Sequence, residues 1–250
     1  GTSLNTRLFN KHGGSGSFMT RWKNWIAFSS THSFNFDGSN DYLDCGDLNT
    51  MDGVSQLTIS AWMKRLASDD RCSIEKSTDN NDRVGLQLAG DGKLYFLMAT
   101  GSGLSYGNVD LTGTDWHHIA GVFNGSLSGN ANRLKIYVNG VLQTLTFSGT
   151  IPATTPSSSA SLLIGKDVPN NNYSTGNIDE VAIWDTALSA SDVTSIYNNG
   201  KVVDFSKSAS YAVDRTANLK LWLRCGDKVE PETSIARSDF YTDFDGTDDY

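Results

Sequence analysis

Short stretches of alternating apolar and polar residues, separated by tight turn signals, follow one another along residues 33–185. In LTISAWMKR (57–65) the alternation places four apolar residues on one face of an extended strand: Leu57, Ile59, Ala61 and Met63. Gly90-Asp91-Gly92 and Asn139-Gly140 each separate two such stretches, as in β-hairpins. This spacing of short strands predicts an all-β fold, a sandwich of antiparallel sheets.

One stretch, LSASDVTSIYNNG at 188–200, has the periodicity of a helix instead. Ser189 is a candidate N-cap because its hydroxyl can accept a hydrogen bond from the backbone three residues later, at Asp192. An apolar stripe follows, and Gly200 offers the left-handed residue that commonly ends a helix. We expect one short helix, packed on the side of the sandwich.

The composition excludes some classes of partner. The chain has 28 Asp and Glu against 20 Lys and Arg and no basic run, so its surface repels phosphate backbones and no nucleic acid is expected. No apolar stretch approaches the ~20 residues that span a bilayer, so no membrane association is expected. Three widely spaced cysteines, Cys45, Cys72 and Cys225, form neither a disulfide framework nor a zinc motif. They favour folding in a reducing compartment, although a single bridge stays open.

The two ends of the chain differ from its middle. Residues 1–31 contain the linker-like HGGSGS (12–17) and an apolar stretch, and we expect an N-terminal arm with a linker. The sandwich is expected over 32–205. Within 206–250 the ending FDGTDDY repeats FDGSNDY of residues 36–42. Self-similarity of this kind predicts tandem repeats, so 206–250 is expected to hold a linker and the first strands of a second, truncated copy.

Eight stretches, in this order, resemble laminin-G-like domains of the concanavalin A-like superfamily, close to the pentraxin type. They are FDGSNDYLD (36–44), LTISAWMK (57–64), DGKLYF (91–96), DWHHIAGVF (115–123), LKIYVNGV (134–141), LLIG (162–165), GNIDEVAIWDTALSASDV (176–193) and IYNNG (196–200). The resemblance covers about residues 33–205. It implies a two-sheet jelly roll that binds glycans or proteins without catalysis, and many members of the family hold calcium.

A narrower resemblance lies near the end of the chain. LKLWLRCGD (219–227), followed by DFDGTDDY, is similar to strings of such modules in tailed-phage structural proteins. It implies an oligomeric virion protein, a fibre or decoration component, that binds a glycan or cell-surface polymer and contacts other virion subunits. Two alternatives stay open: a purely structural virion protein without glycan binding, and a binding module of a carbohydrate-active enzyme or bacterial adhesin, located extracellularly or at the cell surface.

The turn FDGSNDY offers oxygen ligands for calcium. Asp37, Asn40 and Asp41 supply side-chain oxygens of the kind that calcium prefers, and Gly38 lets the backbone turn tightly. In the family this strand lies near the G-x-I-D-E strand, so the resemblance implies that Asp179 completes the site. The alternative is a turn in which the Asp and Asn side chains bond backbone amides and hold no metal.

Two groups of loop residues are candidates for contact with a ligand. Tyr106 and Tyr173 lie in polar stretches and would offer flat apolar faces to a sugar ring. Asp79, Asn80 and Asp82 belong to an acidic stretch, and in pentraxin-like relatives the loops at one end of the sandwich hold the calcium that binds the ligand. The alternatives are loop anchoring by the tyrosines and a solvated acidic loop.

We expect no catalysis. A retaining glycosidase needs two carboxyl groups ~5 Å apart, and the glucanases that share the fold carry theirs at alternate positions of one strand. In NIDEVAIWD, Glu180 is expected on one face of the strand and Asp179 and Asp185 on the other. The adjacent His117 and His118 also face opposite sides and cannot chelate one ion, so His118 is expected to be a packed, hydrogen-bonded histidine.

Overall fold

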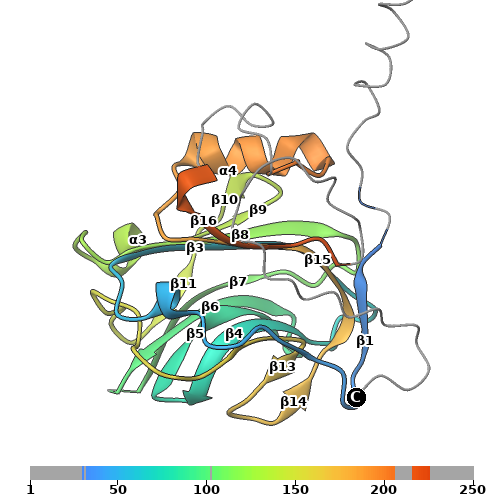
Figure 1. Ribbon diagram of the computed structural model, residues 1–250, viewed down its shortest axis with the longest axis horizontal. Coiled ribbons are helices and arrows are strands. Elements are labelled where there is room, and N and C mark those ends of the chain that lie inside the picture. Colours follow the sequence, from blue (N-terminus) through green and yellow to red (C-terminus); the bar gives the residue numbers. More distant parts are fainter. Residues whose placement is uncertain (1–29, 31, 102, 206–215, 226–250) are drawn as a thin grey trace, which may run out of the picture.

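Two antiparallel sheets pack face to face in the computed structural model, which describes residues 30, 32–101, 103–205 and 216–225 (Figure 1). Sheet A has the order β1–β15–β3–β8–β9–β10, with β16 also paired to β15. Its strands are β1 (Phe34–Asp37), β15 (Thr175–Trp184), β3 (Gln56–Arg65), β8 (His117–Asn124), β9 (Leu134–Val138), β10 (Val141–Leu142) and β16 (Leu219–Leu223).

Sheet B has the order β11–β7–β6–β5–β4–β12–β2. Its strands are β11 (Thr146–Ser148), β7 (Leu104–Asp110), β6 (Lys93–Thr100), β5 (Asp82–Leu88), β4 (Cys72–Asp79), β12 (Leu162–Ile164) and β2 (Leu43–Asp44). A small hairpin of β13 (Lys166–Asp167) and β14 (Asn172–Tyr173) lies on the side of sheet B that faces away from sheet A (Figure 1). The antiparallel sandwich predicted from the strand pattern is confirmed, and its two sheets agree with the jelly roll that the laminin-G-like motifs imply.

Five short helical segments complete the described part: η1 (Asn49–Met51), α3 (Asn130–Arg133), α4 (Ala190–Tyr197), η2 (Asn198–Gly200) and η4 (Thr216–Asn218). None of the helices in the described ranges is long and apolar enough to cross a membrane.

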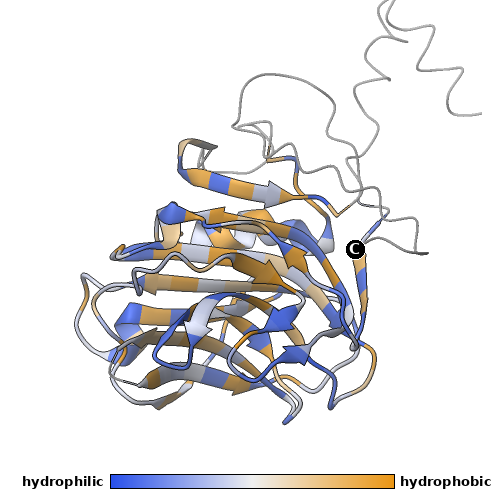
Figure 2. Cartoon of the chain, turned by 60° about the horizontal axis from the view of Figure 1, so that its bottom comes forward, coloured by the Kyte–Doolittle hydropathy of each residue, from blue (hydrophilic) through white to orange (hydrophobic). Residues whose placement is uncertain are grey.

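The main core lies between the two sheets, and a second core lies under α4 on the opposite face of sheet A. Leu57, Ile59, Ala61 and Met63 are all fully buried in the main core, as the alternation in β3 predicts. Trp184 of β15 is fully buried in the second core, against Phe205. Apolar and polar residues alternate along many of the strands in Figure 2. Because β15 is covered on both faces, its last four residues, 181–184, are all apolar.

Helix α4 begins as its sequence predicts. The Ser189 hydroxyl accepts a hydrogen bond from the Asp192 backbone at 3.2 Å, and the Asp192 carboxylate accepts one from the Ser189 backbone at 2.9 Å. The end of the helix differs from the expectation. Asn198, with φ 49°, is the first left-handed residue after the helix, and Asn199 is left-handed as well, so the helix ends before Gly200. Asparagine tolerates this conformation better than other non-glycine residues.

Replacing Ser189 by alanine is expected to lower the free energy of unfolding by about 1 kcal/mol, because one backbone donor of the first helical turn loses its acceptor. Urea denaturation followed by circular dichroism measures the loss. The matched control is Ser195→Ala on the same helix, whose hydroxyl donates to the Ser191 carbonyl at 2.8 Å and does not cap the helix. Equal losses in the two variants would contradict a capping role for Ser189.

The outer edge of β15 is shared by two strands. β1 pairs with residues 175–178, and β16 pairs with residues 181–184. A β-bulge separates the two halves, and Glu180 there has φ 50°. We expected the sandwich to end at residue 205, but β16 is a strand of sheet A, because it satisfies the backbone groups of β15 that β1 leaves open. The arm at 1–29 and the repeated FDGTDDY lie outside the described residues and stay predictions.

Candidate functional site

The side of sheet B that faces away from sheet A carries most of the polar and aromatic strand residues that neither core absorbs. It has two halves. Over β4 and β5 the outward side chains are covered by the β13–β14 hairpin and its turn, residues 166–174. Over β6, β7 and β11 they line a pocket of about 420 Å³. We call this the β6–β7–β11 pocket; its lining consists of Lys93, Tyr95, Tyr106, Asn108, Val109, Asp110, Thr144, Thr146, Phe147 and Ser148.

Two half-buried tyrosines form one part of this pocket. The rings of Tyr95 and Tyr106 meet edge to face, with centroids 5.1 Å apart and planes at 76°. The Tyr95 hydroxyl donates a hydrogen bond to Asp91 at 2.6 Å, which fixes the ring. Burial, and next the Asp91 carboxylate, raise the pKa of Tyr95, so the hydroxyl stays protonated. An apolar ring with a polar tip, held in one orientation, suits contact with a sugar ring.

Asn108 lies at the centre of the pocket. The strand register places it opposite Tyr95 on β6 and Thr146 on β11, and Tyr106 and Asp110 are its neighbours on the same face of β7. The residue is only 8% exposed, and its side chain has no hydrogen-bond partner among the described residues. Its amide atoms are not among the buried atoms that lack a partner, so they still reach solvent. An amide offers one acceptor and two donors, and these stay open to a ligand. Asn108 is therefore prepared to bond a ligand.

The sequence analysis identified only part of this pocket. Tyr106 is present in it, but as a residue of β7 and not of a loop. The sequence analysis did not identify Tyr95 or Asn108, and it took the polar stretch that holds Asn108 and Tyr106 for a loop. The signal that could have found them is the cross-strand register, in which two tyrosines and an amide become neighbours.

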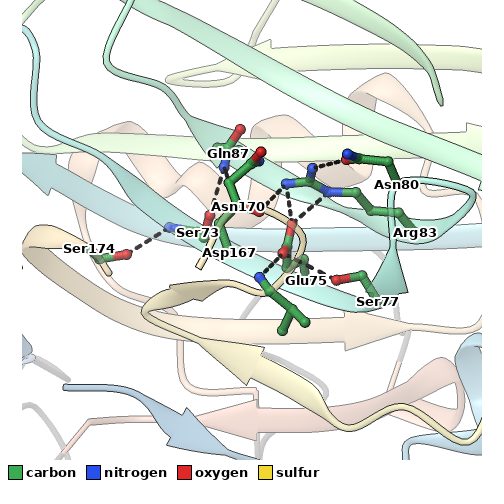
Figure 3. A network of polar contacts seen from close by, with 10 residues as sticks. Ser73, Glu75, Ser77, Asn80, Arg83, Gln87, Asp167, Asn170 and Ser174 are labelled. Atoms are coloured by element: carbon green, nitrogen blue, oxygen red, sulfur yellow. Dashed lines mark hydrogen bonds and ion pairs between the residues drawn. The ribbon is translucent and has the colours of Figure 1, made fainter. Parts of the chain in front are cut away.

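The covered half of the same face holds a buried network of charges (Figure 3). The Arg83 guanidinium binds Glu75 at 2.6 Å and Asp167 at 3.0 Å, and all three side chains are almost completely buried. Glu75 also accepts a hydrogen bond from the Val168 backbone at 3.0 Å. Burial raises the pKa of Glu75 to about 7, and Arg83 opposes this rise. The network attaches the β13–β14 hairpin to β4 and β5.

The acidic stretch predicted to bind a ligand forms the β4–β5 turn. One Asp79 oxygen accepts hydrogen bonds from the backbone of Asn81 at 2.6 Å and of Asp82 at 3.1 Å. Asn80 accepts one from Arg83 at 3.3 Å and so belongs to the buried network. Asp79, Asn80 and Asp82 do not line the β6–β7–β11 pocket. This geometry is that of the alternative, a turn stabilised by its own side chains.

The four predicted calcium ligands do not come together. Asp37 accepts a hydrogen bond from the Ser39 backbone at 2.8 Å, and Asp41 accepts one from the Asp37 backbone at 3.2 Å. Asp37 pairs with Thr175, four positions before Asp179 on β15, so the strand register separates the two carboxylates. Asp179 instead accepts hydrogen bonds from Ser30 at 2.6 Å and from the Glu180 backbone at 2.7 Å.

The arrangement around Asp37, Asn40 and Asp41 therefore resembles the metal-free turn more than a cation site. Within the described ranges, no group of three or more His, Cys, Asp or Glu residues is placed so that it could hold a metal ion. These residues as arranged do not fit calcium, which prefers six to eight oxygen ligands.

The side chain of Tyr173 already contacts other residues of the protein. The ammonium group of Lys166 lies 4.8 Å from the ring centre of Tyr42 and 4.9 Å from that of Tyr173, and donates to the Tyr173 hydroxyl at 3.2 Å. Cation–π contacts of this kind stabilise a loop. Tyr173 thus anchors the β13–β14 hairpin and does not line the pocket.

The carboxylates of β15 bind the C-terminal strand. Glu180 accepts hydrogen bonds from Trp222 at 2.6 Å and Arg224 at 3.3 Å. Asp185, directly after the strand, forms an ion pair with Lys220 at 2.9 Å. Burial, and next Asp179, raise the pKa of Glu180 to about 7. The bulge interrupts the strict alternation that we assumed for this strand. None of its carboxylates lines the pocket.

His118 is packed as expected, with one difference. Its ring lies between those of Trp62, 5.4 Å away, and Tyr197, 5.9 Å away, beneath the C-terminal end of α4. Its Nδ1 atom is buried without a hydrogen-bond partner in the described part of the chain, so the histidine is not hydrogen-bonded as we expected. Burial lowers the pKa of His118 to about 3.

A smaller pocket, of about 200 Å³, lies over sheet A between β8, β9 and the start of α4. Of its two charged lining residues, Arg133 and Lys135, Arg133 is already bound to the carbonyls of Leu127 and Ile151, both at 2.7 Å. No aromatic ring lines this pocket. The β6–β7–β11 pocket is therefore the better candidate site.

The comparisons with known proteins agree with the fold. A family model described as the concanavalin A-like lectin/glucanases superfamily, of the laminin G type, matches residues 37–194. No curated protein matches the chain. Among solved structures, a SAP-like pentraxin from Limulus polyphemus is 16% identical, with a TM-score of 0.46, and the match covers 76% of this chain and 89% of the pentraxin.

Two further solved structures are similar over about half of their own length. Domains LG4–5 of the mouse laminin α1 chain are 17% identical, with a TM-score of 0.49, and the match covers 66% of this chain and 45% of that one. A Bacteroides ovatus protein described as carbohydrate-binding is 15% identical, with a TM-score of 0.51, and the match covers 82% of this chain and 54% of that one. Because the family model matches more than half of the chain, the chain belongs to the concanavalin A-like lectin/glucanase superfamily, as its laminin-G-like motifs predicted.

Proposed function

We propose that the chain is a non-catalytic glycan-binding module and that the β6–β7–β11 pocket is its sugar site. The observation that carries the proposal is the Asn108 amide, which bonds none of the described residues and lies beside two tyrosine rings. A sugar ring presents apolar C–H faces and neighbouring hydroxyls, each of which can donate and accept. The rings of Tyr95 and Tyr106 would contact the apolar face, and Asn108 would bond two of the hydroxyls.

The titration behaviour of the carboxyl groups supports binding over hydrolysis. A glycosidase needs an acid whose pKa is raised next to the scissile bond. Among the described carboxyl groups, a raised pKa is found for Glu75 and Glu180, and neither lines the pocket. Asp91 is engaged by Tyr95, and Asp110 is exposed to solvent opposite Lys93. The family description, which includes lectins, agrees with sugar binding.

The setting that we propose is a tailed-phage virion, where the module would belong to an oligomeric fibre or decoration protein and bind a cell-surface glycan. Its support is the resemblance of LKLWLRCGD and DFDGTDDY to strings of such modules. The pairing of β16 with β15 adds that LKLWL ends a sandwich, so a copy that starts at FDGTDDY would follow a closed module. In a bacterial adhesin or a carbohydrate-active enzyme, the same pocket would make it an extracellular binding module.

The test is a glycan array with the parent protein and with Asn108→Leu. Leucine has a similar size but cannot form hydrogen bonds, so we expect binding to fall at least about tenfold. The free energy of unfolding should stay close to that of the parent, because the Asn108 side chain bonds none of the described residues and no hydrogen bond within them is lost. Asn81→Ala, at the exposed β4–β5 turn outside the pocket, is the control and should bind like the parent.

Three outcomes would contradict the proposal. Unchanged binding by Asn108→Leu would place the sugar site elsewhere on the molecule. Binding that disappears with a calcium chelator would move the site to a metal, since the pocket offers an amide and aromatic rings. Absence of binding to every glycan by the folded parent would favour the purely structural virion role.

A further inference from the structure

We infer that the β6–β7–β11 pocket receives the terminal sugar of a glycan and does not accept the middle of a continuous polysaccharide. This inference rests on the proposed function. It follows from the shape of the outward face of sheet B, on which the pocket is closed along two sides and open along the other two.

The first closed side is the covered half of the sheet. Five outward residues of β4 and β5 are no more than 7% exposed, because the segment 166–174 lies over them. These residues are Ser73, Glu75, Ser77, Arg83 and Gln87. A polysaccharide that ran across the sheet from β11 towards β4 would meet this segment.

This side is held firmly and begins next to the pocket. Gln87 is the cross-strand neighbour of Tyr95, so the tyrosine lies directly beside the covered half. The Gln87 amide donates to Ser73 at 3.2 Å and to Asp167 at 3.0 Å, and Asp167 is in turn bound to Arg83 (Figure 3). Asn170 donates to the same Asp167 carboxylate at 2.7 Å. Moving the segment away would separate Asp167 from Arg83 and Gln87 and would remove the Val168 donor from the buried Glu75, which is costly.

The second closed side lies along the strands. On β6 the outward residues change from half-buried Lys93 and Tyr95 to fully covered Leu97 and Ala99. Tyr106 is the cross-strand neighbour of Leu97 and stands at this limit of the pocket. Past Tyr106 a ligand would therefore meet the apolar outward side chains of β6, which offer no polar group to bond.

The open sides lie at Asp110 and along β11. Asp110, Thr144, Thr146 and Ser148 line the pocket and are exposed to solvent. β11 is also the last strand of sheet B, so a ligand that leaves over it passes directly into solvent. The terminal sugar would thus lie on Tyr95, Tyr106 and Asn108, and the remainder of the glycan would leave across the edge of the sheet.

The test uses the unmodified protein on an array in which each sugar is presented both at a non-reducing end and inside a chain. We expect the bound glycans to share one terminal sugar, and glycans that contain this sugar only internally to give no signal. For the strongest glycan, the same compound extended by one sugar on its non-reducing end should bind at least about tenfold more weakly by isothermal titration calorimetry.

Two results would overturn the inference and leave the proposed function intact. They are equal binding of the extended compound, and affinity that rises with every added sugar along an oligosaccharide series. Loss of binding in Asn108→Leu alongside either result would show that the pocket is the sugar site but accepts internal sugars. No binding of any glycan would instead refute the proposed function and, with it, the inference.

Discussion

Replacing Arg83 by methionine is expected to lower the free energy of unfolding by about 3–5 kcal/mol, which would be the largest effect of any single substitution proposed for this protein. The reason is that Arg83 is the shared partner of two buried carboxylates, Glu75 and Asp167. Methionine fills a similar volume but leaves both without a counter-charge. Urea denaturation near neutral pH, followed by tryptophan fluorescence, measures the loss.

Two comparisons separate the loss of charge pairing from the loss of packing. The triple variant Arg83→Met, Glu75→Gln, Asp167→Asn has no buried charge at this position and should be more stable than Arg83→Met alone. The penalty of the single variant should also shrink as the pH falls. The pKa of Glu75 is already raised to about 7 by burial, and removing Arg83 raises it further, so the unpaired carboxyl becomes neutral in mild acid. A penalty that is small and independent of pH would show that the network is exposed to water.

Replacing His118 by phenylalanine is expected to remove an acid-sensitive element of the fold. Burial lowers the pKa of His118 to about 3, from an ordinary value near 6.5. Below pH ~6.5 the unfolded chain takes up a proton that the folded chain rejects, so this residue destabilises the fold as the pH falls. Between pH ~6.5 and ~4.5 its contribution is about 2–3 kcal/mol. Phenylalanine keeps the ring contacts with Trp62 and Tyr197 and cannot take up a proton.

The measurement is the difference between the unfolding free energies of the variant and the parent at several pH values. The difference is needed because Glu75 and Glu180 act in the opposite direction. Their raised pKa values, both about 7, stabilise the folded chain as the pH falls towards about 4.5. They are present in both proteins, and therefore cancel. His32→Gln, at an exposed position, is the control and should follow the parent. A difference that does not change with pH would contradict the buried, neutral state of His118.

The fold could be predicted from the sequence because its determinants are local. Alternation over two positions identifies the core face of β3, and residues three apart, Ser189 and Asp192, identify the start of α4. The end of α4 was less predictable, because Asn198 and Gly200 can both adopt the left-handed conformation that ends a helix. In the structure Asn198 adopts it first, directly after Tyr197. The motifs in order identified the superfamily.

The candidate site was less accessible, because its members become neighbours only through strand pairing. Asn108 and Tyr106 belong to β7, whereas Tyr95 comes from β6 and Thr146 from β11. An Asp and Asn-rich turn looks the same in sequence whether it holds calcium or bonds its own backbone. The register of β1 on β15 places Asp37 opposite Thr175, away from Asp179, and so distinguishes the two.

The sequence by itself therefore determined the class of the fold, the face that each main strand buries, the start of the helix and the superfamily. These properties depend on residues two to four positions apart, which interact in any chain that carries the pattern. The tertiary structure decided where the pocket lies and that β16 completes sheet A. It also decided that the segment 166–174 covers half of the outward face of sheet B, where its Asp167 binds Arg83 from 84 residues away in the sequence. Such contacts depend on which strand edges and buried charges remain unpaired once the sheets have formed, and this is a property of the whole molecule.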